Sequence, residues 1–259
     1  MPIFALSEHS GFPPPELATP EGLLAVGGDL SPRRLLLAYR RGIFPWYGEG
    51  EPILWWSPDP RLVLHPAEFH LSRRLARTLR AGRFRLSADE AFPEVIRECG
   101  RVRRETGEGT WLVPEMIAAY GRLHEEGFAH SFEAWCGGRL AGGLYGVSLG
   151  GCFFGESMFT RVSDASKAAL AALVGFCLAR GIELIDCQVT TGHLQRMGAR
   201  EIPRKAFLAA LERLLSRPTL RGRWHLDPGG DLAALLAPPR RRAPAEASSA
   251  CRPRRPAHD

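Results

Sequence analysis

Three polar side chains stand in stretches of sequence that otherwise have the apolar pattern of buried β-strands. Asp186 and Gln188 share one face of a predicted strand over 183–189, because successive side chains of a strand point to opposite faces. Glu156 lies on a second predicted strand, over 152–159. A buried carboxylate or amide is costly unless it is paired or belongs to an active site. The three residues are therefore candidates for a catalytic cluster. The alternative is a structural Asp186 that a neighbouring backbone group or arginine satisfies.

The elements around these strands predict an α+β fold. Ser163-Asp164 can cap a helix over 165–180, which Gly181 can end. A strand reached through a helix usually lies parallel in the middle of a sheet and is covered on both faces, and we expect this of 183–189. Three antiparallel strands are predicted before that helix, over 128–136, 139–147 and 152–159, and Gly137-Gly138 forms a hairpin turn between the first two.

The same periodicities place the remaining elements. On strand 152–159, Glu156 is expected to share a face with Phe154 and Met158. Further helices are predicted over 35–41 (after Ser31-Pro32), 71–80, 89–99, 114–126 and 192–197, a last strand over 199–202 and a final helix from Pro203. This order predicts an acetyltransferase-like (GNAT-type) mixed sheet with helices.

Composition indicates a soluble globular protein. The chain has 259 residues, 45% hydrophobic and 24% charged, with a net charge of +6, which favours an anionic partner. Its six cysteines show no paired spacing, and no signal peptide or membrane-spanning run is recognised, so we expect a cytoplasmic protein that does not bind membranes. We also expect a monomer. From Pro238 onward Pro, Arg, Ala and Ser dominate, which predicts a disordered basic tail.

Arginines and tryptophans indicate contact with a nucleic acid. Five arginines with no acid between them follow the predicted helix 71–80 and its continuation, at Arg73, Arg77, Arg80, Arg83 and Arg85. Such a stripe suits phosphate contacts, with a solvated helix face as the alternative. Trp46, on a turn between Pro45 and Gly48, is a candidate platform for stacking a base, and Trp111 is a second aromatic presented by a turn.

Two kinds of site are rejected on spacing. His124 and His130 are six residues apart with Gly127 between them, and the zinc-binding HExxH helix needs a spacing of four, so no metal site is predicted. Coenzyme A acetyltransferases hold the pyrophosphate in a glycine-rich turn between a strand and a helix. The corresponding turn here, 158–165, contains no glycine. We therefore expect an acyl donor other than an acyl-CoA, and the arginines and tryptophans indicate that the donor is attached to RNA.

Several segments of the chain resemble one known family, the leucyl/phenylalanyl-tRNA–protein transferases. They include Leu23-Leu-Ala-Val-Gly-Gly-Asp-Leu-Ser31, Gly42-Ile-Phe-Pro-Trp46, Ile53-Leu-Trp-Trp-Ser-Pro-Asp-Pro-Arg61, Gly155-Glu-Ser-Met-Phe159 and Ile185-Asp-Cys-Gln188. The resemblance runs in order from about Phe12 to Phe207. It implies transfer of leucine or phenylalanine, with methionine as a further candidate, from aminoacyl-tRNA to the α-amino group of proteins that begin with Arg or Lys. Such transfer marks these proteins for degradation by the N-end rule and needs no metal or coenzyme.

The resemblance also implies a domain division and residue roles. A small N-terminal α/β domain would span 1–62, an acetyltransferase-like catalytic domain 63–222, and a tail 223–259. Asp186 would orient the acceptor amine or accept its proton, Gln188 would hold that amine, and Glu156 would receive the cationic side chain. The transferred side chain would enter an apolar pocket of Leu144, Met158, Leu170, Leu173, Cys177 and Ile185. Trp46 and Trp111 would stack on the terminal adenosine, and the five arginines would hold the acceptor stem.

Two rival functions are considered. An acyl-CoA-dependent N-acetyltransferase fits the predicted fold, and the glycine-free turn argues against it. A non-catalytic RNA-binding protein would explain the arginines and tryptophans but would leave Glu156, Asp186 and Gln188 without a purpose. A nucleophilic Cys187 is a weaker idea, because strand alternation is expected to point it away from Asp186 and Gln188.

Overall fold

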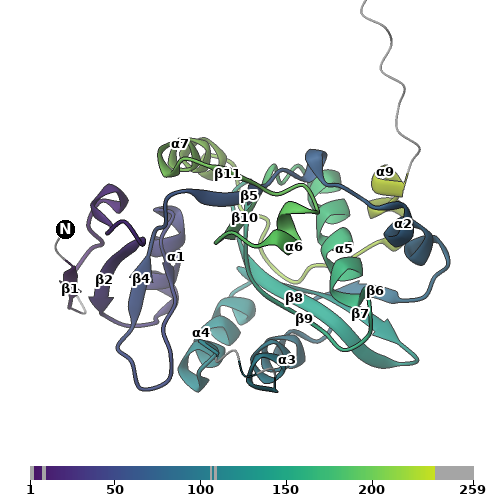
Figure 1. Ribbon diagram of the computed structural model, residues 1–259, viewed down its shortest axis with the longest axis horizontal. Helices are drawn as coiled ribbons and strands as arrows, with labels where there is room; N and C mark the ends of the chain where they lie inside the picture. The colour runs from purple at the N-terminus through teal and green to yellow at the C-terminus, as the bar shows by residue number, and fades with distance from the viewer. Residues whose placement is uncertain (1–2, 8–9, 106, 108–109, 237–259) are drawn as a thin grey trace, which may run out of the picture.

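The computed structural model describes residues 3–7, 10–105, 107 and 110–236, which form two β-sheets with helices packed around them (Figure 1). The smaller sheet lies at the N-terminal end and has the strand order β1 (Phe4–Leu6), β2 (Leu23–Gly27), β4 (Leu54–Trp56), β3 (Phe44–Pro45). The larger sheet has the order β11 (Arg200–Ile202), β5 (Arg61–Leu64), β10 (Leu184–Gln188), β9 (Cys152–Thr160), β8 (Arg139–Leu149), β7 (Ala129–Cys136), β6 (Arg85–Ala88). Both sheets mix parallel and antiparallel pairs, so the predicted α+β class is confirmed.

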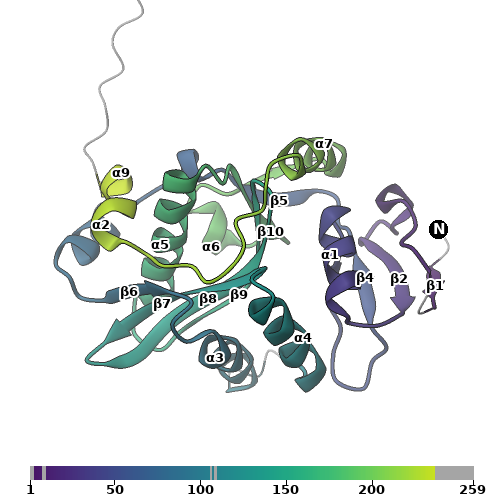
Figure 2. The same ribbon diagram turned by 180° about the vertical axis from the view of Figure 1, so that it is seen from behind.

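Helices cover both faces of the larger sheet. Helices α3 (Phe92–Glu105) and α4 (Pro114–Glu125) lie on one face, and α5 (Ala165–Arg180) lies on the other (Figure 1). Seen from behind, α2 (Arg73–Arg80) and the C-terminal turns α8 (Pro228–Asp231) and α9 (Ala233–Leu236) lie beside α5 (Figure 2). The remaining elements are α1 (Pro32–Arg40), α6 (Gly192–Gln195), α7 (Arg204–Leu215) and the 3-10 turns Pro15–Leu17 and Pro66–Glu68.

The sheet separates two hydrophobic clusters. The first joins the small sheet and α1 to α3, α4 and α7, and its members include Tyr39, Trp55 and Phe207. The second fills the space between the sheet and α5 and includes Phe153 and Phe176. Because the first cluster runs through α1, the N-terminal part of the chain is packed against the face of the larger sheet that carries α4.

Most predicted elements are confirmed, together with the local reasons for them. The Ser31 side chain accepts a hydrogen bond from the Arg34 backbone at the start of α1. Gly181 ends α5 in the left-handed region, with φ 69°. Gly137 and Gly138, with φ of 56° and 75°, form the β7–β8 turn. Strand β10 lies inside the sheet, parallel to β9 and antiparallel to β5.

Two predictions about helix starts are wrong. Asp164 makes no side-chain cap to α5; its carboxylate pairs with Lys167 and Arg74 instead. The helix predicted from 89 begins at Phe92, because Asp89 has a left-handed φ of 54° and its carboxylate binds the backbone of Ser131 and Trp224. Long-range partners for these acids therefore override their local capping preference.

The predicted alternation of β9 is also wrong, because a β-bulge interrupts it. Gly146 pairs with Gly155 and Tyr145 pairs with Ser157, so Glu156 is an additional residue without a partner on β8. After the bulge the faces exchange. Phe154 lies in the first hydrophobic cluster, whereas Met158 packs against the second.

The expected domain boundary at 62/63 falls inside β5, which belongs to the larger sheet. Part of the segment assigned to the tail is packed: Trp224 is buried and stacks on His130 at a centroid distance of 3.6 Å. The predicted disordered tail lies in 237–259, outside the described residues. Among the helices of the described residues, none is long and apolar enough to cross a membrane.

Candidate active site

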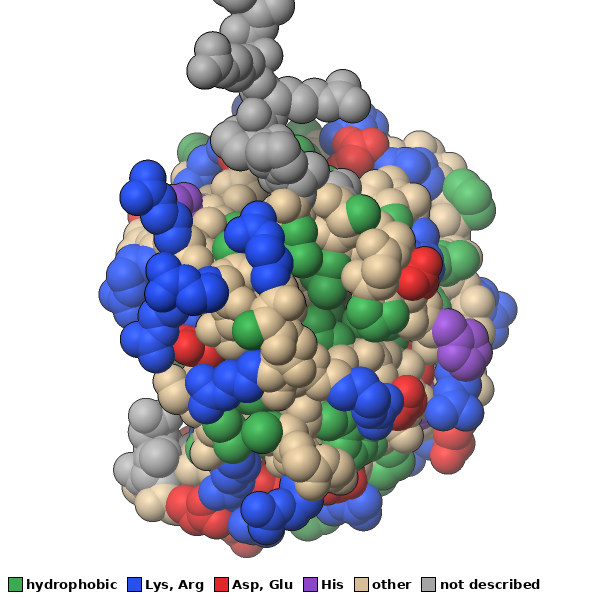
Figure 3. Space-filling view, turned by 90° about the vertical axis from the view of Figure 1, so that its right-hand side faces the viewer, with side chains coloured by type: hydrophobic (Ala, Val, Ile, Leu, Met, Phe, Trp, Pro, Cys, Tyr) green, Lys and Arg blue, Asp and Glu red, His purple; other side chains and the backbone are tan. Residues whose placement is uncertain are grey.

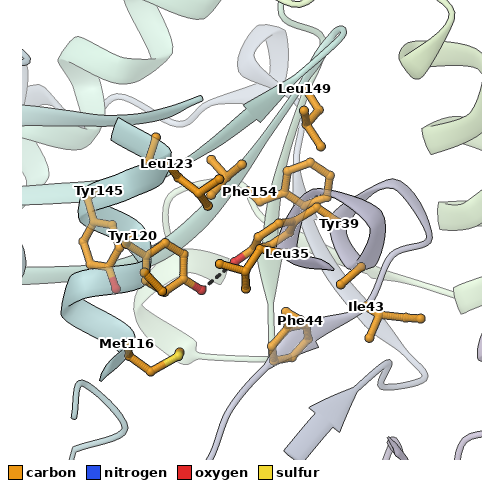
Figure 4. Close-up of a cluster of buried hydrophobic side chains, with 14 of the residues drawn as sticks. Leu35, Tyr39, Ile43, Phe44, Met116, Tyr120, Leu123, Tyr145, Leu149 and Phe154 are labelled. Atoms are coloured by element: carbon orange, nitrogen blue, oxygen red, sulfur yellow. Dashed lines mark hydrogen bonds between the residues drawn. The ribbon is translucent and has the colours of Figure 1, made fainter. Parts of the chain in front are cut away.

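Glu156 is the centre of a buried polar cluster at the junction of the two sheets. The bulge in β9 directs its carboxyl group toward α1 and α4, where the hydroxyls of Tyr39 and Tyr120 each lie 2.8 Å from a carboxyl oxygen. The two hydroxyls are also 2.6 Å from each other, and Figure 4 shows them pointing together from the two helices. Glu156 is only 8% exposed. Burial raises the pKa of Glu156 to about 7, against the lowering effect of its hydrogen bonds.

Gln188 connects this cluster to strand β10. Its side-chain Nε2 donates to Glu156 Oε1 over 2.8 Å. Its backbone has a φ of 62°, and the pairing of β10 with β5 shifts register between Asp186 and Gln188. The alternation of the strand therefore stops at Gln188, and the expectation that Cys187 points away from Gln188 is wrong, because both residues line the same cavity. Burial and the charge of Asp186 raise the pKa of the Cys187 thiol, which disfavours a thiolate nucleophile.

Asp186 lies behind Gln188 and is fully buried. Both of its carboxylate oxygens accept hydrogen bonds from Arg61 of β5, over 2.8 and 2.7 Å. Asp186 Oδ1 also accepts from the backbone N–H of Gln188, over 2.9 Å. The predicted contact between Asp186 and an acceptor amine disagrees with this burial. The alternative of an aspartate satisfied by a neighbouring arginine agrees with the geometry.

A cavity of about 560 Å³ opens beside the Glu156 cluster. Its wall combines polar side chains of the larger sheet with aromatic side chains of the N-terminal part and of the segment before α4. The wall includes Phe44, Trp46, Trp111, Glu156, Met158 and Gln188. Trp46 is 40% exposed, and its ring centroid lies 6.0 Å from that of Trp111. The guanidinium carbon of Arg103 lies 4.1 Å from the centroid of the Trp111 ring on the same wall.

Of the six residues expected to form an amino-acid pocket, Met158 alone is on the wall of this cavity. The other five are buried in the second hydrophobic cluster, against which Met158 packs: Leu144, Leu170, Leu173, Cys177 and Ile185. The six residues are therefore gathered around α5, behind the cavity wall. Their role in holding a transferred side chain stays a prediction.

The predicted arginine stripe lies at the far end of the larger sheet. Arg73, Arg77 and Arg80 are exposed on α2, Arg83 follows the helix and Arg85 begins the edge strand β6. Figure 3 faces this end of the molecule and shows Lys and Arg side chains gathered on one side of it. Arg85 is paired with Glu90, Arg80 donates to the Leu236 carbonyl, and the guanidinium of Arg83 lies over the Phe84 ring.

Three residues of this cluster are not predicted from the sequence: Tyr39, Tyr120 and Arg61. The tyrosines stand in helices whose apolar spacing identifies them as core, and no local pattern shows that their hydroxyls meet a carboxylate. Arg61 could have been identified more easily than the tyrosines, because an arginine inside an apolar strand requires a buried partner. In the described part of the chain, no group of three or more His, Cys, Asp and Glu side chains is placed to hold a metal ion.

The cavity therefore combines aromatic side chains with a buried acid and a held amide, and the turn between β9 and α5 has no glycine. These features are compatible with a transferase whose donor is held in another way than an acyl-CoA. Comparison with known proteins agrees. A family model described as "Leucyl/phenylalanyl-tRNA protein transferase" matches residues 63–212, and the model of its N-terminal domain matches 28–59.

Curated relatives extend the match over most of the chain. A leucyl/phenylalanyl-tRNA–protein transferase of Anaeromyxobacter sp. (strain Fw109-5) is 64% identical over 88% of this chain and 97% of its own length. One of Desulfatibacillum aliphaticivorans is 61% identical over 90% of this chain and 100% of its own length. The chain therefore belongs to the leucyl/phenylalanyl-tRNA–protein transferase family.

Proposed function

We propose that the protein moves leucine or phenylalanine from aminoacyl-tRNA to the α-amino group of proteins that begin with Arg or Lys, in the cytoplasm, and that 63–222 is an acetyltransferase-like domain. Membership of the family supports the donor and the reaction class. The observation that carries the chemistry is the amide of Gln188, which is held at the cavity wall by Glu156. Position, more than acid–base strength, is what this reaction needs.

The reaction is the aminolysis of an ester. The acceptor nitrogen attacks the ester carbonyl carbon, a C–N bond forms, the C–O bond to the terminal ribose breaks, and the proton lost by the amine balances the one gained by the ribose oxygen. An α-amino group has a pKa of ~7.7–8.0, so a sizeable neutral fraction exists near neutral pH. Holding that amine against the ester supplies most of the acceleration.

Gln188 is the residue to which we assign this positioning. Because Nε2 donates to Glu156, the amide oxygen Oε1 is the atom that can accept an N–H of the acceptor amine. Asp186 acts indirectly, through Gln188. Its Oδ1 accepts a hydrogen bond from the Gln188 backbone N–H, and its negative charge is paired with Arg61. We therefore propose Asp186 as a positioning residue rather than a base.

The transferred side chain is proposed to reach the apolar residues around α5. Met158 stands between the cavity and this cluster, so the choice among leucine, phenylalanine and methionine would depend on how Met158 and its neighbours pack. An apolar pocket discriminates by only ~1–3 kcal/mol per methylene, so shape has to contribute to selectivity.

Trp46→Leu is expected to raise KM for aminoacyl-tRNA about 10-fold with a smaller change in kcat. The reason is that an exposed indole on the cavity wall is suited to stack on the terminal adenine, and one base stack contributes ~1–3 kcal/mol. Leu37→Ala is the matched control, because Leu37 on α1 is 39% exposed, like Trp46, and is not among the residues of the cavity wall. Equal KM values for the two variants would contradict the stacking role.

Arg77→Ala is expected to weaken tRNA binding and to reduce the slope of log K against log salt by about one. Arg77 is exposed on α2 within the basic end of the molecule, where a phosphate can be contacted. Arg33→Ala on α1 is the control, being equally exposed and far from α2 in the fold. If both variants keep the wild-type slope, the acceptor stem does not bind along α2.

Transfer of labelled leucine from Leu-tRNA tests the proposed function directly. The acceptor is one protein prepared with Arg or with Ala at its N-terminus. Labelling of the Arg form alone supports both the donor and the acceptor rule. If tRNA binds and neither form is labelled, the proposed function is wrong.

A further inference from the structure

The hydroxyls of Tyr39 and Tyr120 and the carboxyl group of Glu156 form a closed circuit of oxygen–oxygen contacts. Tyr39 to Glu156 Oε1 is 2.8 Å, Tyr120 to Glu156 Oε2 is 2.8 Å, and Tyr39 to Tyr120 is 2.6 Å. All three lie in the range of O–H···O hydrogen bonds, each of which requires one proton. Figure 4 shows the tyrosine pair between the packed side chains of α1, α4 and β9.

An ionised Glu156 leaves this circuit one proton short. Each phenol supplies a single proton, so two protons must serve three contacts. If both phenols donate to the carboxylate, their oxygens face each other at 2.6 Å with lone pairs only. If one phenol donates to the other, a carboxylate oxygen 2.8 Å from a hydroxyl loses its donor. Either arrangement leaves a costly unpaired contact in a buried site.

A neutral Glu156 supplies the missing proton, and one arrangement then satisfies every contact. Oε1 accepts from both Tyr39 and Gln188 Nε2, as a carbonyl oxygen can. Oε2 has one phenol neighbour and carries the proton, which it donates to Tyr120; Tyr120 in turn donates to Tyr39. We infer that Tyr39 and Tyr120 are positioning residues that hold Glu156 as a neutral carboxylic acid in the free protein below neutral pH.

The site around the circuit favours the protonated form of Glu156. Burial is the largest effect and raises the pKa of Glu156. Hydrogen bonds donated to an ionised carboxylate by Tyr39, Tyr120 and Gln188 would lower it, and the negative charge of Asp186 raises it. Burial and the nearby Glu156 also keep the pKa of both phenols well above the usual value, so the phenols stay protonated. Other ionisable groups face the site from packed elements: Tyr145 of β8, Arg61 of β5 paired with Asp186, Cys187 of β10, and Arg103 and His193 on the cavity wall. Of these, Arg103 favours the ionised form by its charge.

A consequence for acceptor recognition rests on the proposed function. A neutral Glu156 offers no charge to an empty cavity, and a cation that enters lowers its pKa and favours loss of the proton. An acceptor with an N-terminal Arg or Lys would therefore bind with release of a proton from Glu156, and the carboxylate so formed would pair with the cation. An uncharged N-terminal side chain would leave Glu156 protonated.

A carbon NMR titration of the free protein, labelled at glutamate Cδ, tests the protonation state. The Glu156 signal is assigned as the one missing in Glu156→Gln, with Glu133→Gln as control because Glu133 is another buried glutamate whose pKa is raised by burial. The expected midpoint lies near 7, far above the ordinary 4.5. A midpoint near 4.5 would overturn the inference.

Tyr39→Phe, Tyr120→Phe and the double variant test the role of the phenols. In a closed circuit the Tyr39–Tyr120 hydrogen bond is lost in either single variant, so the midpoint shift of the double variant must differ from the sum of the single shifts. If the shift of the double variant equals the sum of the single shifts, the phenols are two independent donors to a carboxylate. That result would overturn the inference of a closed circuit. If the two tyrosines only fill space with their rings, which Phe retains, the Glu156 midpoint would be unchanged in all three variants.

Calorimetry at pH 6 in two buffers of different ionisation heat tests the coupling to acceptor binding. A short peptide beginning with Arg is expected to release more protons than the same peptide beginning with Ala, and the difference is expected to vanish in Glu156→Gln. Equal release by the two peptides would overturn the coupling. The titration of the free protein needs no substrate, so failure of the proposed function in the transfer assay is distinguishable from failure of this inference.

Discussion

Gln188→Ala is expected to lower kcat/KM for aminoacyl transfer about 100-fold or more, with little change in stability. Holding the attacking nucleophile in the reactive geometry is a positioning effect, and its loss costs about 10²-fold. The side chain of Gln188 is held by Glu156 and lies at the cavity wall, so its removal deprives the amine of a fixed acceptor. The measurement is the rate of labelled leucine transfer at saturating and limiting acceptor concentrations.

Cys187→Ala is the matched control for this loss. Cys187 is the preceding residue and lines the same cavity, yet burial raises the pKa of its thiol, and its Sγ is placed near the Ile185 carbonyl of its own strand. Its removal is expected to leave transfer within about threefold of the wild type, far below the loss of about 10²-fold expected when a positioning group is removed. Loss of activity in Cys187→Ala with retention in Gln188→Ala would reverse the assignment and make the thiol the reactive group.

Arg61→Ala is expected to destabilise the protein by about 3–5 kcal/mol, the typical effect of removing one partner of a buried ion pair. Asp186 would then carry an unpaired charge at zero exposure. The guanidinium is also packed between the rings of Phe44 and Phe207, at 4.8 and 4.7 Å, and donates to the Gly42 carbonyl. Denaturant unfolding followed by fluorescence measures the loss.

Two further variants separate the ion pair from general packing. Glu90→Ala breaks the exposed Arg85–Glu90 pair and is expected to cost no more than about 1 kcal/mol. The double variant Arg61→Leu with Asp186→Leu removes both buried charges and is expected to be more stable than Arg61→Ala. Its transfer activity should stay low, because the Gln188 backbone N–H has lost its acceptor. An Arg61→Ala protein as stable as Glu90→Ala would show that the buried pair contributes little.

Most of the local structure, and the residues of the candidate site, could be predicted from the amino-acid sequence. Hydrophobic periodicity placed α5, the β7–β8 hairpin and β10, because these patterns depend on side chains a few residues apart. The cost of burying polar groups was enough to single out Glu156, Asp186 and Gln188, since an acid or amide inside an apolar strand requires a reason wherever the strand lies.

The partners and surroundings of those residues follow from the tertiary structure. Arg61 and Asp186 are 125 residues apart, and Tyr39 and Glu156 are 117 apart, so no local pattern connects them. The bulges at Glu156 and Cys187 arise from strand pairing across the sheet, and they break the alternation from which the facing of side chains is predicted. Asp186 is thereby turned into the core and Gln188 toward the cavity, because the register of a sheet is set by its neighbours rather than by the strand itself.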